Sequence, residues 1–100
     1  MTFVFQAPAK LEFFAAIAWY ENQQLGLGQD FAREVIETLR RARLRPELFQ
    51  KVRGRARKVR LRRFHAYSIY FAIKQDCFSV LAIFHGARNP KDLLRRFDKD

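Results

Sequence analysis

The sequence predicts an α+β domain, in which an antiparallel helical hairpin packs on one face of a mostly antiparallel, twisted sheet. Three observations predict this class. Two neighbouring segments of the first half have helical periodicity and are joined by a glycine-rich break, whereas the second half alternates or is strongly apolar over short segments. The length of 100 residues suits one hydrophobic core, so we expect residues 1–100 to form a single domain.

The chain is expected to begin with a short strand, "TFVF", that ends before Pro8. From residue 9 to residue 24 the period becomes helical. The residues at the helical spacing i, i+3, i+4 and i+7 are predicted to face the core, and they are Leu11, Phe14, Ala15 and Ala18. A neighbouring row that widens this apolar stripe consists of Phe13, Ile17 and Tyr20.

A second helix is predicted over residues 29–42, because Phe31, Val35 and Leu39 recur at every fourth position. The connecting letters "LGLG" contain two glycines and are short, which favours an antiparallel pair of helices. Pro46 ends the helical part of the chain.

Residues 51–63, "KVRGRARKVRLRR", hold eight Lys and Arg residues. The second half of this segment alternates, with Val59 and Leu61 on one side, so it predicts a strand with one apolar and one cationic face. The cationic face would carry Lys58, Arg60 and Arg62, and the arginines that lead into it are Arg53, Arg55 and Arg57.

The two segments "YSIYFAIK" and "CFSVLAIFH" predict further strands, joined by a tight turn at Gln75 and Asp76. The second of them is the most apolar, so we expect it to be central in the sheet. A short last helix follows, with Asn89 as its cap and Pro90 at its first position. Its apolar residues are Leu93, Leu94 and Phe97. The sheet face opposite the hairpin is then expected to carry the cations.

Basic residues outnumber acidic ones, with 20 Lys and Arg against 10 Asp and Glu and a formal net charge of +10. A surplus of this size favours an anionic partner, such as nucleic acid, an acidic protein segment or anionic lipid. The N-terminal residues lack the pattern of a signal peptide, and no apolar run reaches about 18 residues. We therefore expect a cytoplasmic protein with no membrane span.

The composition also limits the chemistry. Cys77 is the only cysteine, which excludes an intrachain disulfide and a cysteine-based zinc site. The carboxylates are scattered, and the "GLG" letters join two helices instead of following a strand, so no phosphate-binding glycine loop is predicted. We expect no metal and no cofactor.

Lys58, Arg60 and Arg62 are candidate contacts to a phosphate backbone, because like charges on one strand face repel one another and stability alone does not favour them. The alternative is a solvated edge strand whose charges block aggregation. His85 ends an apolar strand, where a histidine is usually structural. If it lies near these arginines and Arg88, the cluster has the parts for acid/base cleavage of RNA.

Arg88 has a structural alternative as well, since it can pair with Asp92 or with a helical Glu. The adjacent residues Trp19, Tyr20 and Glu21 are interpreted as packing side chains plus one polar anchor.

Four stretches occur in order over nearly the whole chain: "WYE", "LGLGQDF", "RRFHAYSIYF" and "VLAIFHGARNP". This ordered set resembles the RelE/ParE superfamily of bacterial toxins. The resemblance implies a type II toxin–antitoxin module, in which an acidic, partly disordered antitoxin holds a small basic toxin inactive in a hetero-oligomer. It also implies the hairpin-on-sheet fold.

The superfamily divides by mechanism. RelE-like members cut mRNA on the ribosome, and the positions here that could serve are Arg60, Arg62, His85 and Arg88. ParE-like members bind DNA gyrase and need no catalytic set. The tail after Pro90 has no tyrosine or histidine, and "WYE" and "HGAR" are closer to the ParE-like group.

We therefore expect a toxin that arrests growth by binding an essential bacterial machine, DNA gyrase, through its basic surface and terminal helix. The expected target contacts are Lys58, Arg60, Arg62, Arg88, Arg95 and Arg96. A ribosome-dependent mRNA endonuclease and a plain nucleic-acid-binding module stay open as alternatives, so the sequence leaves open whether the chain is an enzyme.

Overall fold

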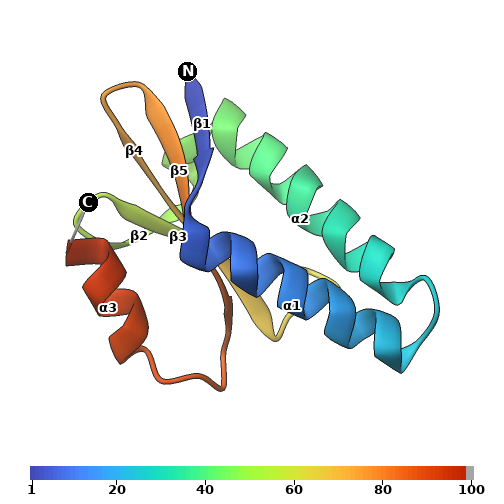
Figure 1. Ribbon diagram of the computed structural model, residues 1–100. Coiled ribbons are helices and arrows are strands. Elements are labelled where there is room, and N and C mark those ends of the chain that lie inside the picture. The colour runs from blue at the N-terminus through green and yellow to red at the C-terminus, as the bar shows by residue number, and fades with distance from the viewer. Residues whose placement is uncertain (99–100) are drawn as a thin grey trace.

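The computed structural model describes residues 1–98, and its elements form three layers. Figure 1 shows the sheet between the hairpin of the first two helices and the short last helix. The helices are α1 (Ala7–Gln23), α2 (Leu27–Leu44) and α3 (Lys91–Asp98), with a single 3₁₀ turn at Pro46–Leu48. The strands are β1 (Thr2–Phe5), β2 (Gln50–Arg53), β3 (Ala56–Arg60), β4 (Tyr67–Lys74) and β5 (Cys77–His85).

The five strands lie in the order β1-β5-β4-β3-β2. β1 runs parallel to β5, and the other neighbours are antiparallel. The predicted α+β class, with its N-terminal strand and short C-terminal helix, is confirmed. The expectation that β5 is the central strand was wrong. β4 is the middle strand, and β5 lies beside it in the interior of the sheet. No helix among residues 1–98 combines the length and the apolar character needed to cross a membrane.

The predicted tight turn between β4 and β5 is confirmed. Lys74 pairs with Cys77, and the two residues between them, Gln75 and Asp76, have positive φ angles of 52° and 60°. Such a pair of left-handed residues matches the right-handed twist of the flanking strands.

A bulge in β5 lets its apolar residues serve both layers. Tyr70 pairs with Ala82 but the next residue, Phe71, pairs with Val80, so Leu81 is the extra residue. Leu81 and Ala82 consequently both pack on the α3 side of the sheet, whereas Val80 packs on the hairpin side.

The inward face of α1 differs from the predicted stripe. Ala9 and Ala16 are buried, but Leu11 is 71% exposed and Phe14 is 55% exposed. Phe13, Ile17 and Tyr20 are half-buried and pack on the core, as the wider row predicted, whereas Ala15 and Ala18 are exposed. The prediction was wrong because α1 is apolar on nearly every side, so the helical period alone admits more than one stripe.

The contact between α1 and α2 is closest at Gly28. A Cβ added there would lie 2.6 Å from the carbonyl oxygen of Ile17, so only glycine fits. Glu21 is the polar anchor that was expected, since its carboxylate accepts the N–H groups of Gly26 (2.9 Å) and Gly28 (3.0 Å). The predicted α2 face is also confirmed, because Phe31, Val35 and Leu39 are buried.

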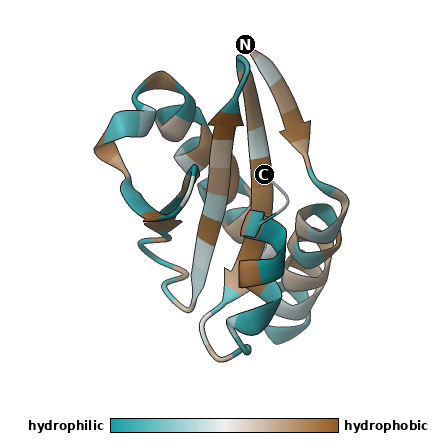
Figure 2. Ribbon diagram, turned by 90° about the vertical axis from the view of Figure 1, so that its left-hand side faces the viewer, coloured by the Kyte–Doolittle hydropathy of each residue, from teal (hydrophilic) through white to brown (hydrophobic). Residues whose placement is uncertain are grey.

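The last helix covers part of the sheet face that was expected to carry cations. Leu93 is buried, and the ring of Phe97 lies 5.5 Å from the ring of Tyr70. Figure 2 shows α3 lying in front of strands rich in hydrophobic residues. Leu94 is 40% exposed and contributes less than predicted. The predicted cap is confirmed, since Asn89 Oδ1 accepts the N–H of Lys91 at 3.0 Å.

Candidate functional site

The predicted cationic strand is shorter than expected. Lys58 and Arg60 lie on β3, but the strand ends at Arg60, and Arg62 lies beyond it in the connection to β4. There the N–H groups of Arg62 and Arg63 donate to the carboxylate of Glu34, at 2.5 Å and 3.2 Å. The alternation of side chains predicted Arg62 as a further cation on this face. That part was wrong, because the backbone N–H groups of Arg62 and Arg63 bond to Glu34 of α2 and not to a neighbouring strand.

Two of the arginines that were predicted to lead into the cationic face, Arg53 and Arg57, are engaged within the protein. Arg53 pairs with Asp98 at 3.0 Å, and Arg57 donates to the backbone carbonyl of Phe49 at 2.8 Å. Arg55 lies in the turn between β2 and β3.

A hollow of about 330 Å³ lies where β3, β4 and the end of β5 meet. It brings Arg60 together with His85, as the nuclease hypothesis required. Arg60 Nε donates to the carbonyl of His65 at 2.7 Å, and the N–H of Ala87 donates to His85 Nδ1 at 3.0 Å. A neutral His85 therefore carries its proton on Nε2. The full lining is Lys58, Arg60, His65, Ala66, Ser68, His85, Gly86 and Ala87.

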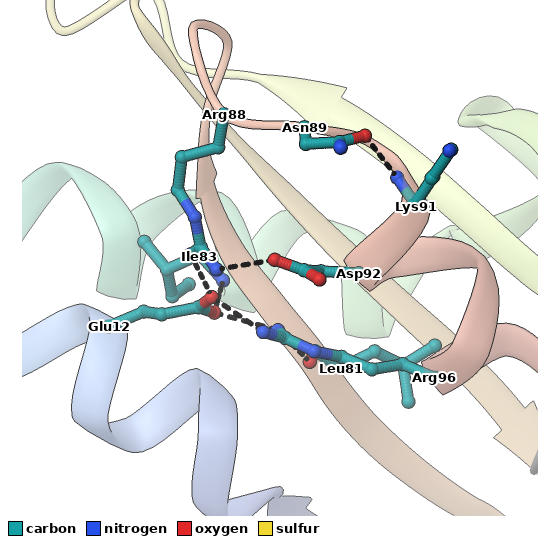
Figure 3. A network of polar contacts seen from close by, with 8 residues as sticks. All are labelled: Glu12, Leu81, Ile83, Arg88, Asn89, Lys91, Asp92 and Arg96. Atoms are coloured by element: carbon teal, nitrogen blue, oxygen red, sulfur yellow. Dashed lines mark hydrogen bonds and ion pairs between the residues drawn. The ribbon is translucent and has the colours of Figure 1, made fainter.

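Arg88 does not line this hollow. Its guanidinium pairs with Glu12 of α1 and, at 3.4 Å, with Asp92 of α3 (Figure 3). The structural alternative for Arg88, a bond to Asp92 or to a helical Glu, is thus what the structure shows. Arg62 is absent from the lining as well, so two of the four residues considered for RNA cleavage lie elsewhere.

Glu12 is the centre of this network, and no local pattern around it predicts such a role. Its carboxylate accepts from Arg96 at 2.9 Å and 2.7 Å and from the N–H of Ile83 at 3.1 Å, in addition to Arg88. Arg96 also donates to the carbonyl of Leu81 at 3.1 Å. The side chains of Glu12 and Arg96 are 12% and 19% exposed. The network joins α1, β5 and α3 (Figure 3).

The six expected target contacts therefore differ in availability. Arg88 and Arg96 have their charge compensated by carboxylates, which favours a bracing role. Arg95 is exposed on α3, and Lys58 and Arg60 face the hollow. Target binding by any of the six stays a prediction.

A second hollow, of about 580 Å³, lies between α1 and the adjoining ends of β4 and β5. Trp19 was expected to pack but is 56% exposed at this place, with its ring edge-on to Tyr20 at 5.1 Å. Burial raises the pKa of Tyr20. The pKa of Tyr67 is also raised, mainly by burial and to a smaller extent by the nearby Tyr20. The full lining is Glu12, Ala15, Ala16, Trp19, Tyr20, Ala66, Tyr67, Ile83, His85 and Arg88.

Comparison with known proteins bears on the fold. Neither a family model nor a curated protein sequence matches the chain. Among solved structures, a chain of the "Chromosomal ParDE TA system from P. aeruginosa" is similar, with a TM-score of 0.67 and 15% identity. The alignment covers 85% of this chain and 95% of that chain.

The fold is thus similar to that of a chain of the ParDE system. At this level of identity the likeness concerns the fold, so the hairpin-on-sheet architecture implied by the resemblance is supported independently of sequence motifs.

Proposed function

We propose that this chain is the toxin of a type II toxin–antitoxin module, and that it arrests growth by binding DNA gyrase. The observation that carries the proposal is the fold shared with a chain of the chromosomal ParDE toxin–antitoxin system. The net charge of +10 agrees with a partner or target that is acidic. Arg62 lines neither hollow beside His85, and Arg88 is paired with Glu12 and Asp92, which favours a binding mechanism over a catalytic one.

The antitoxin, on this proposal, docks where β1 borders α2. β1 is an edge strand, so one row of its backbone N–H and C=O groups is open to pairing. Beside it lies a groove of about 380 Å³ with two arginines at its rim, which suits a segment that carries apolar and acidic side chains. The groove is lined by Phe3, Phe5, Phe13, Ile36, Leu39, Arg40 and Arg43.

Induced expression of the chain is expected to stop bacterial growth, and co-expression of its acidic antitoxin is expected to restore it. Arg43→Glu should weaken antitoxin binding by about tenfold and prevent the rescue, because it reverses a charge at the groove. Isothermal titration with the antitoxin and growth curves measure the two effects.

Arg41→Glu is the matched control, since Arg41 is exposed on the same helix but does not line the groove. Equal loss of affinity in both variants would show that net charge, and not this groove, recruits the antitoxin. Growth that continues on expression of the chain would remove the toxin proposal itself.

The target is tested with purified components. At micromolar concentration the chain is expected to inhibit DNA supercoiling by gyrase, because ParE-like binding to gyrase needs no bond-breaking step in the toxin. A supercoiling assay on relaxed plasmid, with total mRNA integrity followed in expressing cells, provides the measurement. Full supercoiling activity at that concentration, together with rapid mRNA loss in cells, would contradict gyrase as the target.

The second candidate is a ribosome-dependent mRNA endonuclease, and one observation favours it. His85, Arg60 and Lys58 line one hollow, where a histidine could move a proton beside cations that stabilise a phosphate. His85→Ala and Arg60→Ala would then each abolish mRNA cleavage. If both variants stay toxic and mRNA stays intact, the nuclease candidate fails.

A further inference from the structure

The two hollows adjoin at the end of β5. Ala66 and His85 line both of them, so the ring of His85 stands between a larger aromatic space and a smaller cationic one. The larger hollow, of about 580 Å³, is within the range that small ligands occupy in proteins.

Aromatic rings form the walls of the larger hollow. Trp19 stands edge-on to Tyr20, and the ring of Tyr67 lies 5.0 Å from that of His85 at an interplanar angle of 86°. Ala15 and Ala16 face the space with side chains that leave it open. Aromatic walls of this kind hold nucleobases, because every base offers a flat π-face for stacking.

The larger hollow also offers polar groups for the edge of a base. The hydroxyls of Tyr20 and Tyr67 make no hydrogen bond within residues 1–98. The N–H of Ala87 occupies His85 Nδ1, which leaves His85 Nε2 to face a ligand. Two hydroxyls and one ring nitrogen beside an apolar space can thus contact the edge of a planar base.

The smaller hollow suits a phosphate. Lys58 and Arg60 line it together with the hydroxyl-bearing Ser68. The bond from Arg60 Nε to the carbonyl of His65 fixes the guanidinium, and its terminal nitrogens have no partner within residues 1–98. A fixed guanidinium beside an ammonium group is a favourable setting for a phosphate oxygen.

We propose that these two hollows form one binding site for an unpaired nucleotide of a single strand, with its base beside Trp19 and its phosphate at Lys58 and Arg60. A base must leave the stack to enter such a space, so duplex nucleic acid should bind the site poorly. The smaller hollow is also the one that the nuclease candidate uses, but nucleotide binding is measured with the purified chain and requires neither mRNA cleavage nor gyrase.

Trp19 is the only tryptophan in the chain, so its fluorescence reports directly on the larger hollow. The probes are single-stranded DNA and RNA tetranucleotides, a DNA tetramer with abasic sites, and a short duplex. The tetranucleotides are expected to quench Trp19 and to bind about tenfold more tightly than the abasic tetramer, which has the same phosphates but cannot stack. The DNA and RNA arms show which sugar the site prefers.

Ala15→Leu fills the larger hollow from an exposed helix position, and Ala18→Leu makes the same change on α1 outside it. The first is expected to reduce tetranucleotide affinity to the abasic level, and the second to leave it unchanged. Lys58→Ala should lower the slope of log affinity against log salt by about 0.7, the value for one phosphate contact on a single strand.

Any of three results would overturn the proposal: no binding of either tetranucleotide, equal binding of the normal and abasic tetramers, or equal binding of the duplex. The abasic and duplex comparisons use the unaltered chain, so they decide the matter even if Ala15→Leu disturbs the helix.

Discussion

Glu12→Gln is expected to lower the free energy of unfolding by about 3 kcal/mol, because it removes a mostly buried carboxylate that bridges Arg88 and Arg96. Glu12 accepts from Arg88, from Arg96 and from the N–H of Ile83. The amide of Gln can keep some of these bonds, but it cannot compensate two positive charges. With Arg96 only 19% exposed, water cannot fully take the place of the carboxylate.

Urea denaturation and thermal melting measure this effect, and a loss of about 3 kcal/mol corresponds to a fall in Tm of about 12–20 °C for a chain of this size. Glu37→Gln is the control, since Glu37 pairs with Arg40 at the surface, where both side chains are more than half exposed. Its effect should stay below about 0.5 kcal/mol. Similar losses in the two variants would mean that the Glu12 network does not hold α3 against the sheet.

Gly28→Ala is expected to destabilise the protein by about 2 kcal/mol. The new Cβ would lie 2.6 Å from the carbonyl oxygen of Ile17 and 3.0 Å from the Glu21 carboxylate, so the two helices must move apart. Such overpacking costs up to about 3 kcal/mol, and the better helix propensity of alanine offsets about 1 kcal/mol of it.

Gly86→Ala provides the comparison. Its Cβ would meet the carbonyl oxygen of Ala66 at 3.5 Å, an ordinary contact, so this change should be nearly neutral. Chemical denaturation of both variants gives the answer. A neutral Gly28→Ala would indicate that the hairpin tolerates a wider separation than this packing implies.

Local signals allowed most of the fold to be predicted from the sequence. The Asn89-Pro90 cap and the turn at Gln75 and Asp76 each depend on residues a few positions apart, and both are confirmed. The face of α2 was predictable because Arg33 and Glu37 mark its solvent side clearly.

The same reasoning failed where composition carries no contrast. Helix α1 has apolar residues on nearly every side, so the period could not separate the buried Ala16 from the exposed Phe14. The alternation that ended at Arg62 could not show that β3 stops at Arg60, because the cause is a carboxylate on α2, Glu34.

The candidate site was predictable only in part. The basic strand made Lys58 and Arg60 predictable, and the position of His85 at the end of an apolar strand made it a candidate. All three residues line the smaller hollow. Nothing local linked Arg96 or Arg88 to Glu12, since more than 70 positions of sequence separate these partners. The exposure of Trp19 could not be predicted either, because α1 has apolar residues on nearly every side and the helical period does not identify the buried face.

The pairing of β1 with β5 constrains the order in which native contacts can form during synthesis. Thr2 lies opposite Cys77, so this ladder closes a loop of about 75 residues, whereas the β4–β5 hairpin closes over a two-residue turn. The ion pair of Glu12 likewise cannot form until Arg96 has been synthesised. During synthesis from the N-terminus, the first strand and first helix therefore have no final partners until the last quarter of the chain emerges. A chain that stops short of Arg96 lacks its closing ion-pair network, and one that stops before Cys77 also lacks the partner of β1.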